Sequence, residues 1–577
     1  MDELIRGDKW LRSVHHLPEH PFGRGRHPST IIGALAHHAR ARSCEPFLTE
    51  IRNGGFHGTI RYGRALSEVG QRQVLLGSWG LQSGECVGVL GQNSIDFVLA
   101  TLAVLAAGGV VVLLSHQDPH PRIDSQVRFA NVRFLLHGSA CAGAAKACAS
   151  VERTCPLEEF GRLAASLQGF DRIDQTFPKP TDAALIVFTS GTTGAPKAVV
   201  QSHYSVAHNA FSLTEHHCIR PGVRLLCVLP LHHVNGLEFT VFSVMVGGGH
   251  TVISRGFNGL DFWSLVRDHG IHIVSLVPNL LGILADRPGL RGRDPLPLRY
   301  AVSAAAPLSV LIAQRVWDQL GLRIVQGYGL SEVTNFSCLL PTQLADSEYQ
   351  RWMLSGRRTS IGPALPGQEV EILDDHGLGQ AGAEGEIVIR GDCVMSGYLN
   401  NPTATQEAFR GNWFHTGDLG YFVPDQHGRK YFHVAGRIRE IAKRSGALVS
   451  LLEVDEALLS VPGVADAGSA AFANRWVGEE IGAVVIQKPG SALTQEAITD
   501  HCSRVLPFFA VPKAIDFVEE IPRTATGKIR RAEIGGRFAP FHDRLFMDPR
   551  RAESSKAPEA RERPYSPSIS LTKPEKS

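Results

Sequence analysis

A loop rich in glycine and hydroxyl side chains carries the clearest chemical signal in the 577-residue sequence. It reads FTSGTTGAPK over residues 188–197 and follows an apolar, β-branched run. Glycines let backbone N–H groups approach phosphate oxygens, the hydroxyls add donors, and Lys197 adds a positive charge. The Walker pattern, GxxxxGK followed by Ser or Thr, is absent. We therefore expect a polyphosphate site of another kind.

Other segments bring together residue types that suit a nucleotide and an acid. A tyrosine can stack on a base, a carboxylate can bind Mg²⁺ or accept hydrogen bonds from vicinal hydroxyls, and a lysine can neutralise phosphate. Taken singly, each has a plainer explanation: a Gly-rich turn is usually structural, one of two adjacent histidines can simply be packed, and a loop lysine is ordinarily a solvated charge. The segments are PLHHVNG (230–236), SAAAPL (303–308), QGYGLSE (326–332), WFHTGD (413–418), GRIRE (436–440) and PRTATGK (522–528).

In this order, the segments resemble those of the adenylate-forming superfamily, which includes acyl-CoA synthetases, nonribosomal-peptide adenylation domains and beetle luciferases. The loop is similar to TSGTTGxPKG, with Ala198 where glycine is usual. The later segments resemble GYGxTE, with Ser331 in place of threonine, then WxxTGD, GRxR and PRTxTGK. The resemblance covers most of the chain, up to Lys528.

The resemblance implies an ATP site and a magnesium site. Tyr328 is expected to stack on adenine, Asp418 to accept hydrogen bonds from both ribose hydroxyls, and Arg437 to reach the ribose and phosphate. Glu332 is expected to help hold Mg²⁺. The complete set expected to bind ATP is Thr189, Ser190, Gly191, Thr192, Thr193, Gly194, Lys197, Tyr328, Ser331, Asp418 and Arg437.

The resemblance also implies a catalytic lysine and an acid pocket. Lys528 is expected to neutralise charge on the attacking carboxylate and the α-phosphate. His233 is expected to act at the acid, beside pocket residues Gly236, Ser303, Ala304 and Ala305. Relatives read SGGAPL at 303–308, so two extra methyl groups predict a narrowed pocket for a small, flat or unusually shaped acid. No aspartate lies within 230–236, which argues against an α-amino acid.

The resemblance implies two half-reactions, formation of an acyl-adenylate and transfer of the acyl group to a thiol, which need different surroundings. It also implies a hinge that exchanges these surroundings. Arg439 is expected at the hinge, and Lys443 and Gly446 are expected to line the channel for the thiol. Leu451 stands where proline is usual.

Runs of apolar β-formers alternate with Ala/Leu-rich stretches, which predicts an α/β fold of layered sheets and helices. Strands are expected at 86–90, 184–188 and 273–277, and a helix at 260–269. The eighteen-residue apolar run 97–114 is expected to form a helix, a turn at Gly108 and Gly109, and a buried strand rather than a membrane span. The expected parts are an N-terminal extension (1–28), a large domain binding ATP and acid (29–435), a hinge (436–440), a small mobile α+β domain (441–540) and a disordered tail (541–577).

Composition excludes some partners. With 43% hydrophobic residues and a net charge of +2, the chain has a sizeable core and no strong field, so neither nucleic acid nor a membrane is an expected partner. Its ten cysteines show no CxxC pair, so free thiols and a cytoplasmic location are expected. Cys141, Cys148 and Cys155 recur every seven residues, which we interpret as a helix stripe rather than a metal site.

The leading hypothesis is an AMP-forming ligase that joins a carboxylic acid to coenzyme A through an acyl-adenylate, using ATP and Mg²⁺. A second hypothesis keeps the adenylate but delivers the acyl group to the phosphopantetheine of a carrier protein, to an amine or to another nucleophile. No large insertion of the kind found in carrier-loading relatives lies between Glu332 and Gly362, which favours coenzyme A. A third hypothesis is a catalytically silent nucleotide-binding protein, suggested by the substitutions at Ala198, Ala304, Ala305 and Leu451.

Overall fold

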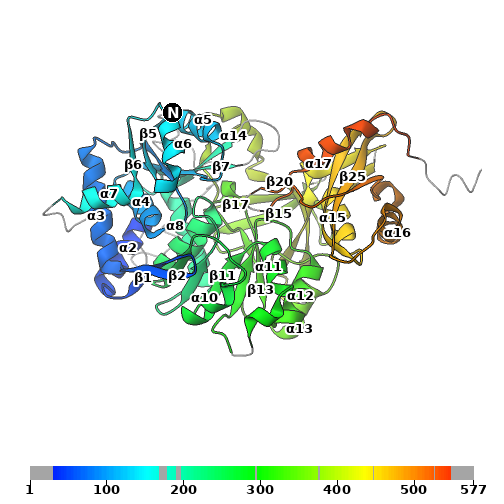
Figure 1. The fold of residues 1–577 in the computed structure, drawn as a ribbon, viewed down its shortest axis with the longest axis horizontal. Helices are drawn as coiled ribbons and strands as arrows, with labels where there is room; N and C mark the ends of the chain where they lie inside the picture. The colour runs from blue at the N-terminus through cyan, green and yellow to red at the C-terminus, as the bar shows by residue number, and fades with distance from the viewer. Residues whose placement is uncertain are drawn as a thin grey trace, which may run out of the picture.

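The computed structural model describes residues 30–167, 178–189, 197–292, 295–374, 377–445, 447–524 and 527–546. Figure 1 shows three sheets with their helices in the larger part of the molecule and a smaller group, containing β25, α15, α16 and α17, at one end. The expected extension 1–28 lies outside the described residues.

The first sheet has seven strands, five of them parallel. The antiparallel strands β8 and β18 close one edge, where β8 pairs with β7 on one side and β18 on the other. In spatial order the strands are β18 (Gly397–Tyr398), β8 (Lys197–Ser202), β7 (Ala183–Thr189), β4 (Val110–Leu114), β3 (Cys86–Leu90), β5 (Val132–His137) and β6 (Arg153–Pro156).

The second sheet has eight strands, parallel except at its two edges. Its order is β14 (Cys338–Leu339), β13 (Ile324–Tyr328), β12 (Tyr300–Ser303), β11 (Ile273–Leu276), β9 (Arg224–Cys227), β10 (His250–Ser254), β1 (Pro46–Arg52) and β2 (Gly55–Arg61). The strands expected at 86–90, 184–188 and 273–277 are thus confirmed as β3, β7 and β11.

Helices fill the space between these two sheets and cover their outer faces. One core cluster joins α2, α3, α4 and α8 to apolar side chains of both sheets, and α4 touches β3, β4 and β1. On the far faces, α5 and α6 pack on the seven-stranded sheet, and α10, α11 and α12 on the eight-stranded one. The layered α/β fold is therefore confirmed.

The helices of the larger part begin and end as follows: α2 Ile31–Ala41, α3 Tyr62–Ser78, α4 Ile95–Ala106, α5 His120–Phe129, α6 Ala142–Ala147, α7 Leu157–Ala165, α8 His203–His216, α9 Val244–Val246, α10 Phe262–Asp268, α11 Pro278–Ala285, α12 Val310–Leu320, α13 Asp346–Tyr349 and α14 Pro402–Ala408. Shorter 3-10 turns are η2 Ser139–Cys141, η4 Pro288–Arg291 and η5 Ser331–Val333, and the π-helices are η3 Asn235–Ser243 and η6 Gln350–Leu354.

The apolar run 97–114 divides as its glycines predict. Ser94 caps α4 by accepting a hydrogen bond from the N–H of Phe97, and the helix ends before Gly108, whose φ is +73°. The strand β4 follows at once and is buried along its whole length. No helix among the described residues is both long and apolar enough to cross a membrane.

The third and fourth sheets lie toward the C-terminus. The third contains β16 (Gly377–Leu378), β15 (Gln368–Asp374), β17 (Gly385–Gly391), β20 (Trp413–Pro424), β19 (Phe409–Arg410) and, paired with β20, β21 (Lys430–Arg437). After the 3-10 turn η7 (Ile438–Glu440) comes a five-stranded sheet of β22 (Ile441–Arg444), β23 (Ala447–Ser450), β24 (Val464–Asn474), β25 (Gly478–Gln487) and β26 (Ala514–Phe517). The elements that accompany it are α15 (Leu451–Leu459), α16 (Gln495–Val505), η8 (Phe508–Ala510), α17 (Arg531–Arg537) and η9 (Ala539–Phe541).

Two expectations need correction. The three cysteines spaced by seven do not share a helix: Cys141 ends η2, Cys148 follows α6, and Cys155 lies in β6. All three are buried, and all ten cysteines are free thiols. The expected disorder does not apply to residues 541–546, because Phe541 and Phe546 pack on the small domain's core and Asn474 donates hydrogen bonds to two carbonyls of this segment.

Candidate functional site

Three of the described residues with the expected nucleotide chemistry, Tyr328, Asp418 and Arg437, lie together. Asp418 of β20 and Arg437 of β21 are direct cross-strand partners, with Arg437 Nε 3.0 Å from Asp418 Oδ1. Tyr328, the last residue of β13, donates its hydroxyl hydrogen to Asp418 Oδ2 at 2.7 Å. Burial raises the pKa of Tyr328, and the Asp418 carboxylate raises the pKa of Arg437. The three side chains form one polar group, buried at Tyr328 and Asp418 and partly exposed at Arg437, that offers a carboxylate, a guanidinium and an aromatic ring.

A second group lies around Glu332, in the turn that follows β13. Tyr398 donates its hydroxyl hydrogen to Glu332 Oε1 at 3.0 Å, and Lys197 Nζ lies 4.5 Å from the centre of the Tyr398 ring. Lys197 begins β8, which pairs with the two-residue strand β18 that carries Tyr398. The pairing therefore brings the expected phosphate lysine to the ring of Tyr398 and the expected magnesium ligand to its hydroxyl group. We did not expect Tyr398 from the sequence.

The glycine-rich loop itself falls between two described ends. Thr189 and Lys197 are register partners in the β7–β8 pair, and Thr189 Oγ1 donates to the Lys197 carbonyl at 3.4 Å. Ser190, Gly191, Thr192, Thr193 and Gly194 lie outside the described residues. Ala198, which replaces the usual glycine, is buried in regular strand and pairs with Phe188. The substitution is therefore accommodated without a change of secondary structure.

Lys528 reaches this site from the small domain. Burial and the positive Arg437 lower its pKa to about 8, against the opposing effect of Asp418, Glu332 and Glu440. Its loop is closed by hydrogen bonds from the Thr524 N–H to the Lys528 carbonyl and from the Lys528 N–H to Thr524 Oγ1. The position of a Cβ built on Gly527 is 3.6 Å from the Asn279 side chain of α11, so the loop abuts the large domain.

His233 is buried, and the charge of Lys528 acts on it. Burial and the Lys528 ammonium lower the pKa of His233 to about 4, so its imidazole is neutral at physiological pH. The neighbouring His232 is 4% exposed and packs against the rings of His116 and His233. Of the adjacent pair, His232 packs against other histidine rings, and His233 is the one whose pKa is lowered by the charge of Lys528.

The expected acid-pocket residues differ in their surroundings. A Cβ on Gly236 would lie 2.3 Å from the Pro230 carbonyl oxygen, so this close approach alone requires glycine. Ser303 ends β12 with its hydroxyl buried and without a partner, and Ala304 is buried beside it. Ala305 has a φ of +70°, a backbone conformation that favours the glycine found in relatives.

The expected hinge and thiol residues lie at the entrance to the small domain. Arg439 is exposed in η7, and Lys443 is exposed on β22, where its N–H donates to Glu479. Gly446 lies outside the described residues. Leu451 begins α15, the N1 position that proline commonly occupies, so leucine at this position leaves the helix start intact.

The side chains present suit a magnesium–phosphate complex better than a protein-only metal site. No group of three or more His, Cys, Asp or Glu side chains within the described parts of the chain is arranged to hold a metal ion. Glu332 offers a single carboxylate, and Mg²⁺ in nucleotide sites commonly takes one or two carboxylates together with phosphate oxygens and water.

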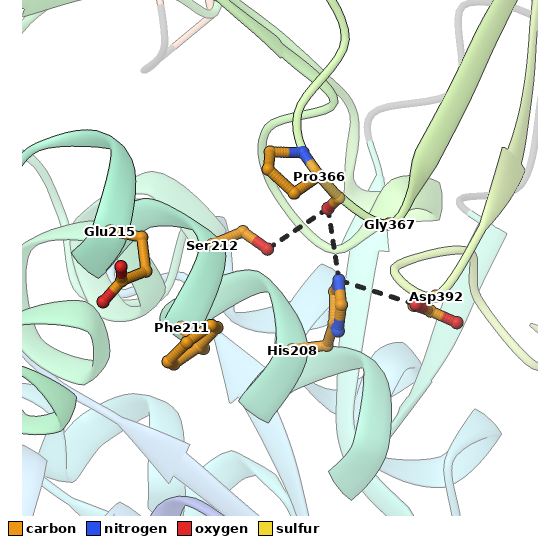
Figure 2. Close-up of a pocket in the computed structure, with 7 residues that line it drawn as sticks. All are labelled: His208, Phe211, Ser212, Glu215, Pro366, Gly367 and Asp392. Atoms are coloured by element: carbon orange, nitrogen blue, oxygen red, sulfur yellow. Dashed lines mark hydrogen bonds and ion pairs between the residues drawn. The ribbon is translucent and has the colours of Figure 1, made fainter. Parts of the chain in front are cut away.

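A separate pocket lies against α8 and is shown in Figure 2. It has a volume of about 290 Å³, and His208 Nε2 faces both Asp392 Oδ2 at 3.6 Å and the Pro366 carbonyl at 3.3 Å. Ser212 Oγ donates to the same carbonyl. Burial lowers the pKa of His208 and raises that of Asp392, and the charge of each partner opposes these shifts. Its lining contains none of the expected nucleotide-binding residues.

Comparison with known proteins matches both parts of the chain to family models. The model described as AMP-binding enzyme matches residues 38–399, and that of the AMP-binding enzyme C-terminal domain matches residues 453–528. A probable CoA ligase of Humulus lupulus is 30% identical over 501 residues, which cover 84% of this chain and 92% of that protein. An oxalate–CoA ligase of Arabidopsis thaliana is 30% identical over 477 residues, covering 80% and 90%.

The fold has counterparts among solved structures. The ATP-bound MatB from Rhodopseudomonas palustris superposes with a TM-score of 0.77 at 24% identity, covering 89% of this chain and all of that one. Since its coverage extends over both parts of the chain, the similarity applies to the complete arrangement of sheets.

Proposed function

Because the chain belongs to the family of AMP-binding enzymes, we propose that it is an AMP-forming carboxylic acid:CoA ligase. The overall reaction converts ATP, an acid and coenzyme A to an acyl-CoA, AMP and pyrophosphate. One observation carries the proposal: Lys528 of the small domain is buried where the charges of Asp418, Glu332 and Arg437 act on it. This arrangement brings a cation to a site that can hold a nucleotide.

In the first half-reaction, a carboxylate oxygen of the acid attacks the α-phosphorus of ATP, and the bond to pyrophosphate breaks. Asp418 accepts hydrogen bonds from the ribose hydroxyls, Tyr328 offers its ring to the adenine, and Arg437 reaches the ribose and phosphate. The Lys528 ammonium neutralises the negative charge that builds up between the carboxylate and the phosphate. When bound, Mg²⁺ at Glu332 supplies further charge neutralisation at the phosphate oxygens.

His233 works in its neutral form at the acid. A neutral imidazole can donate one hydrogen bond without adding a positive charge that would hold the carboxylate in its ground state. Ser303 Oγ is a second free polar atom, buried at the end of β12. With Ala304 and Ala305, these residues form the proposed acid pocket. The methyl groups at 304 and 305 favour a small or flat acid.

In the second half-reaction, the thiol of coenzyme A attacks the acyl carbon, and AMP leaves. Lys528 has to leave the site first, so the small domain turns about Arg439 and brings Lys443 and Gly446 to the channel for the thiol. Coenzyme A as the acceptor is supported by the named activities of the relatives. It is also supported by the segment between Glu332 and Gly362, which holds only the two-residue strand β14 and short helices and no inserted domain.

The test has two stages. Adenylation is first trapped with hydroxylamine in the presence of ATP and Mg²⁺ across aryl, short-chain, long-chain and dicarboxylic acids. Coenzyme A is then added to the best substrate, and the acyl-CoA is detected by mass spectrometry. Acyl-CoA formation supports the proposal and names the class of acid. Adenylation without thioester would instead assign the acyl group to a carrier protein or another nucleophile, and no adenylation with any acid would refute the ligase.

A further inference from the structure

Tyr398 contacts two charged side chains that are expected to act on Mg·ATP. Its hydroxyl group donates a hydrogen bond to Glu332 Oε1 at 3.0 Å, and Lys197 Nζ lies 4.5 Å from the centre of its ring. A hydrogen bond to a carboxylate is stronger than one between neutral groups, and an ammonium group is attracted to the face of an aromatic ring. A single side chain thus contacts both the expected magnesium ligand and the expected phosphate cation.

The backbone around Tyr398 is fixed by hydrogen bonds to two other elements. In the pairing of β18 with β8, Tyr398 lies opposite Val199, and the N–H of Leu399 donates to the Ala198 carbonyl at 2.8 Å. The N–H of Tyr398 itself donates to Thr405 Oγ1 of α14 at 3.0 Å. Tyr398 is only 5% exposed. Because both its backbone and its side chain are held, Tyr398 can support other side chains in fixed positions.

The segment that leads to Tyr398 also holds the turn that carries Glu332. The N–H of Met395 donates to the Glu332 carbonyl at 2.8 Å, and Thr334 Oγ1 donates to the Cys393 carbonyl at 2.6 Å. Glu332 is therefore held at its main chain by Met395 and at its carboxylate by Tyr398. A side chain that is already held in place loses less conformational freedom when it binds a ligand, so binding is tighter.

The Tyr398 hydroxyl is a hydrogen-bond donor at physiological pH. Burial raises the pKa of Tyr398, and the Glu332 carboxylate raises it further, so the hydroxyl keeps its proton. An ionised carboxylate has about four lone-pair sites, and one donor occupies only one of them. Glu332 can therefore accept the hydrogen bond of Tyr398 and still bind a cation.

We propose that Tyr398 is a positioning residue for Mg·ATP: its hydroxyl holds the Glu332 carboxylate in place for Mg²⁺, and its ring holds the Lys197 ammonium in place for the phosphates. The inference rests on the proposed function, because Glu332 and Lys197 meet Mg²⁺ and phosphates only if the chain binds Mg·ATP. Tyr398 acts through these two side chains and is not a catalytic residue.

The test measures the binding of ATP by isothermal titration calorimetry, without acid or coenzyme A, in excess Mg²⁺ and in EDTA. Tyr398→Phe removes the hydroxyl and keeps the ring. It is expected to raise the Kd for ATP about tenfold in Mg²⁺, as expected for the loss of a hydrogen bond to a charged group, but by less than about twofold in EDTA. Tyr398→Leu also removes the ring and is expected to raise the Kd in EDTA about threefold, because Lys197 loses its aromatic contact.

Tyr62→Phe is the matched control, because it removes the same atom from another buried tyrosine. The Tyr62 hydroxyl donates to the Gly249 carbonyl at 2.8 Å, and neither residue belongs to the expected nucleotide site. Tyr62→Phe is expected to lower the melting temperature and to leave the Kd for ATP unchanged in both buffers. If it raises the Kd in Mg²⁺ as Tyr398→Phe does, the effect is only general loosening, and the proposal is wrong.

Three further results would overturn the proposal. A wild-type Kd for Tyr398→Phe in Mg²⁺ would show that the hydroxyl does not position Glu332. An equal rise with and without Mg²⁺ would show that the hydroxyl only supports the fold of the site. In a Glu332→Ala background, Tyr398→Phe is expected to have no further effect in Mg²⁺, because the two act as one unit, and a full tenfold effect there would assign the hydroxyl to another group.

The role of the ring and the proposed function can each fail separately. If Tyr398→Leu binds ATP in EDTA as tightly as Tyr398→Phe does, the ring does not position Lys197. Since the titrations contain no acid, a wild type that shows the expected Mg²⁺-dependent difference from Tyr398→Phe but adenylates no acid would refute the ligase alone. An active ligase in which Tyr398→Phe binds Mg·ATP normally would refute only the role of Tyr398.

Discussion

At the scale of single residues, the proposed mechanism gives Lys528 a role in adenylation alone. Its ammonium is the cation that the small domain brings to Asp418 and Glu332. Lys528→Ala is therefore expected to slow adenylate formation by about 100-fold or more, the usual cost of removing a group that stabilises transition-state charge. Thioester formation from a supplied acyl-adenylate is expected to persist. Equal loss of both half-reactions would show that the lysine is structural.

The pH dependence of the same step follows from the lowered pKa of Lys528, about 8. Because the charged form is the useful one, kcat/KM for adenylation is expected to fall as the pH rises through that value in the free enzyme. Lys528→Arg keeps a positive charge at all of these pH values and is expected to remove the alkaline limb, at a lower rate. Stopped assays from about pH 6 to about pH 10 measure both profiles. An alkaline limb that survives in the arginine variant would belong to another group.

Ala305 offers a test of the acid pocket that is largely free of folding effects. Its φ of +70° destabilises the folded state by about 1 kcal/mol in an L-residue, and Ala305→Gly removes this cost. Glycine also gives the unfolded chain more conformational freedom, which destabilises the folded state by about 0.5–1 kcal/mol. We expect little change in the free energy of unfolding from urea titration, and a broader range of adenylated acids. Ala304→Gly is the control, because Ala304 has an ordinary φ and should lose about 1 kcal/mol. A larger loss at 305 than at 304 would contradict this account.

At the scale of elements, the loop after β13 folds back on itself at Gly329. A Cβ at this position would lie 1.6 Å from the Asn335 carbonyl oxygen, a distance no local adjustment can relieve. Gly329→Ala is expected to push apart the two arms of the loop that carries Glu332, lowering the free energy of unfolding by about 1–3 kcal/mol and raising the KM for Mg·ATP. Gly282→Ala in α11 is the control, since a Cβ at 282 has nothing within 4 Å. If both variants behave alike, the close contact is not what requires glycine.

The sequence predicted elements well where one local pattern decides them. The helix, turn and strand within 97–114 follow from a run of Ala and Leu, two glycines and a run of β-branched residues. The period of seven at Cys141, Cys148 and Cys155 predicts a helix stripe that does not form, because α6 ends at Ala147 and Cys155 lies in the strand β6.

Parts of the site depend on contacts between distant segments, which no local pattern reveals. Tyr398 reaches Glu332 only because the two-residue strand β18 pairs with β8, about 200 residues earlier in the chain. Thr334, whose φ is +66°, is likewise held by the packed core, because Gln201 of β8 donates hydrogen bonds to the Ser331 and Thr334 carbonyls. Family motifs located Lys528 and Asp418, whereas these supporting residues lie outside every motif.

At the scale of the whole molecule, helix α15 holds the small domain against the large one. Its Glu453 forms an ion pair with Arg357. The positive charges of Arg358 and Arg357 lower the pKa of its Glu456, against the larger raising effect of burial. Ser450, just before the helix, donates to the Ala435 carbonyl of β21. Within the small domain, Arg531 ties the turn η7 to α15 by pairing with both Glu440 and Asp455, at 2.7 and 2.8 Å. Turning of the small domain therefore has to break the contacts of Glu453 and Glu456.

Glu456 makes this contact dependent on pH. Burial raises its pKa to about 7, against the lowering effect of Arg358 and Arg357. Between about pH 4.5 and about pH 7, Glu456 is protonated to a greater extent in the docked arrangement than when it is exposed to water. Docking therefore weakens as the pH rises through this window. Glu456→Gln has no proton to lose and is expected to stay docked throughout.

Tryptic cleavage after the exposed residues Arg439 and Lys443 measures the undocked fraction, because cleavage tracks the open population when opening is fast. The ratio of the wild-type to the Glu456→Gln rate cancels the pH dependence of trypsin itself. We expect this ratio to be near one at about pH 5 and to reach about tenfold at about pH 8, the direction set by proton release from Glu456. A ratio that stays constant would mean that Glu456 does not titrate in the docked arrangement. A ratio that falls with pH would mean that its ionised form strengthens docking through Arg357 and Arg358.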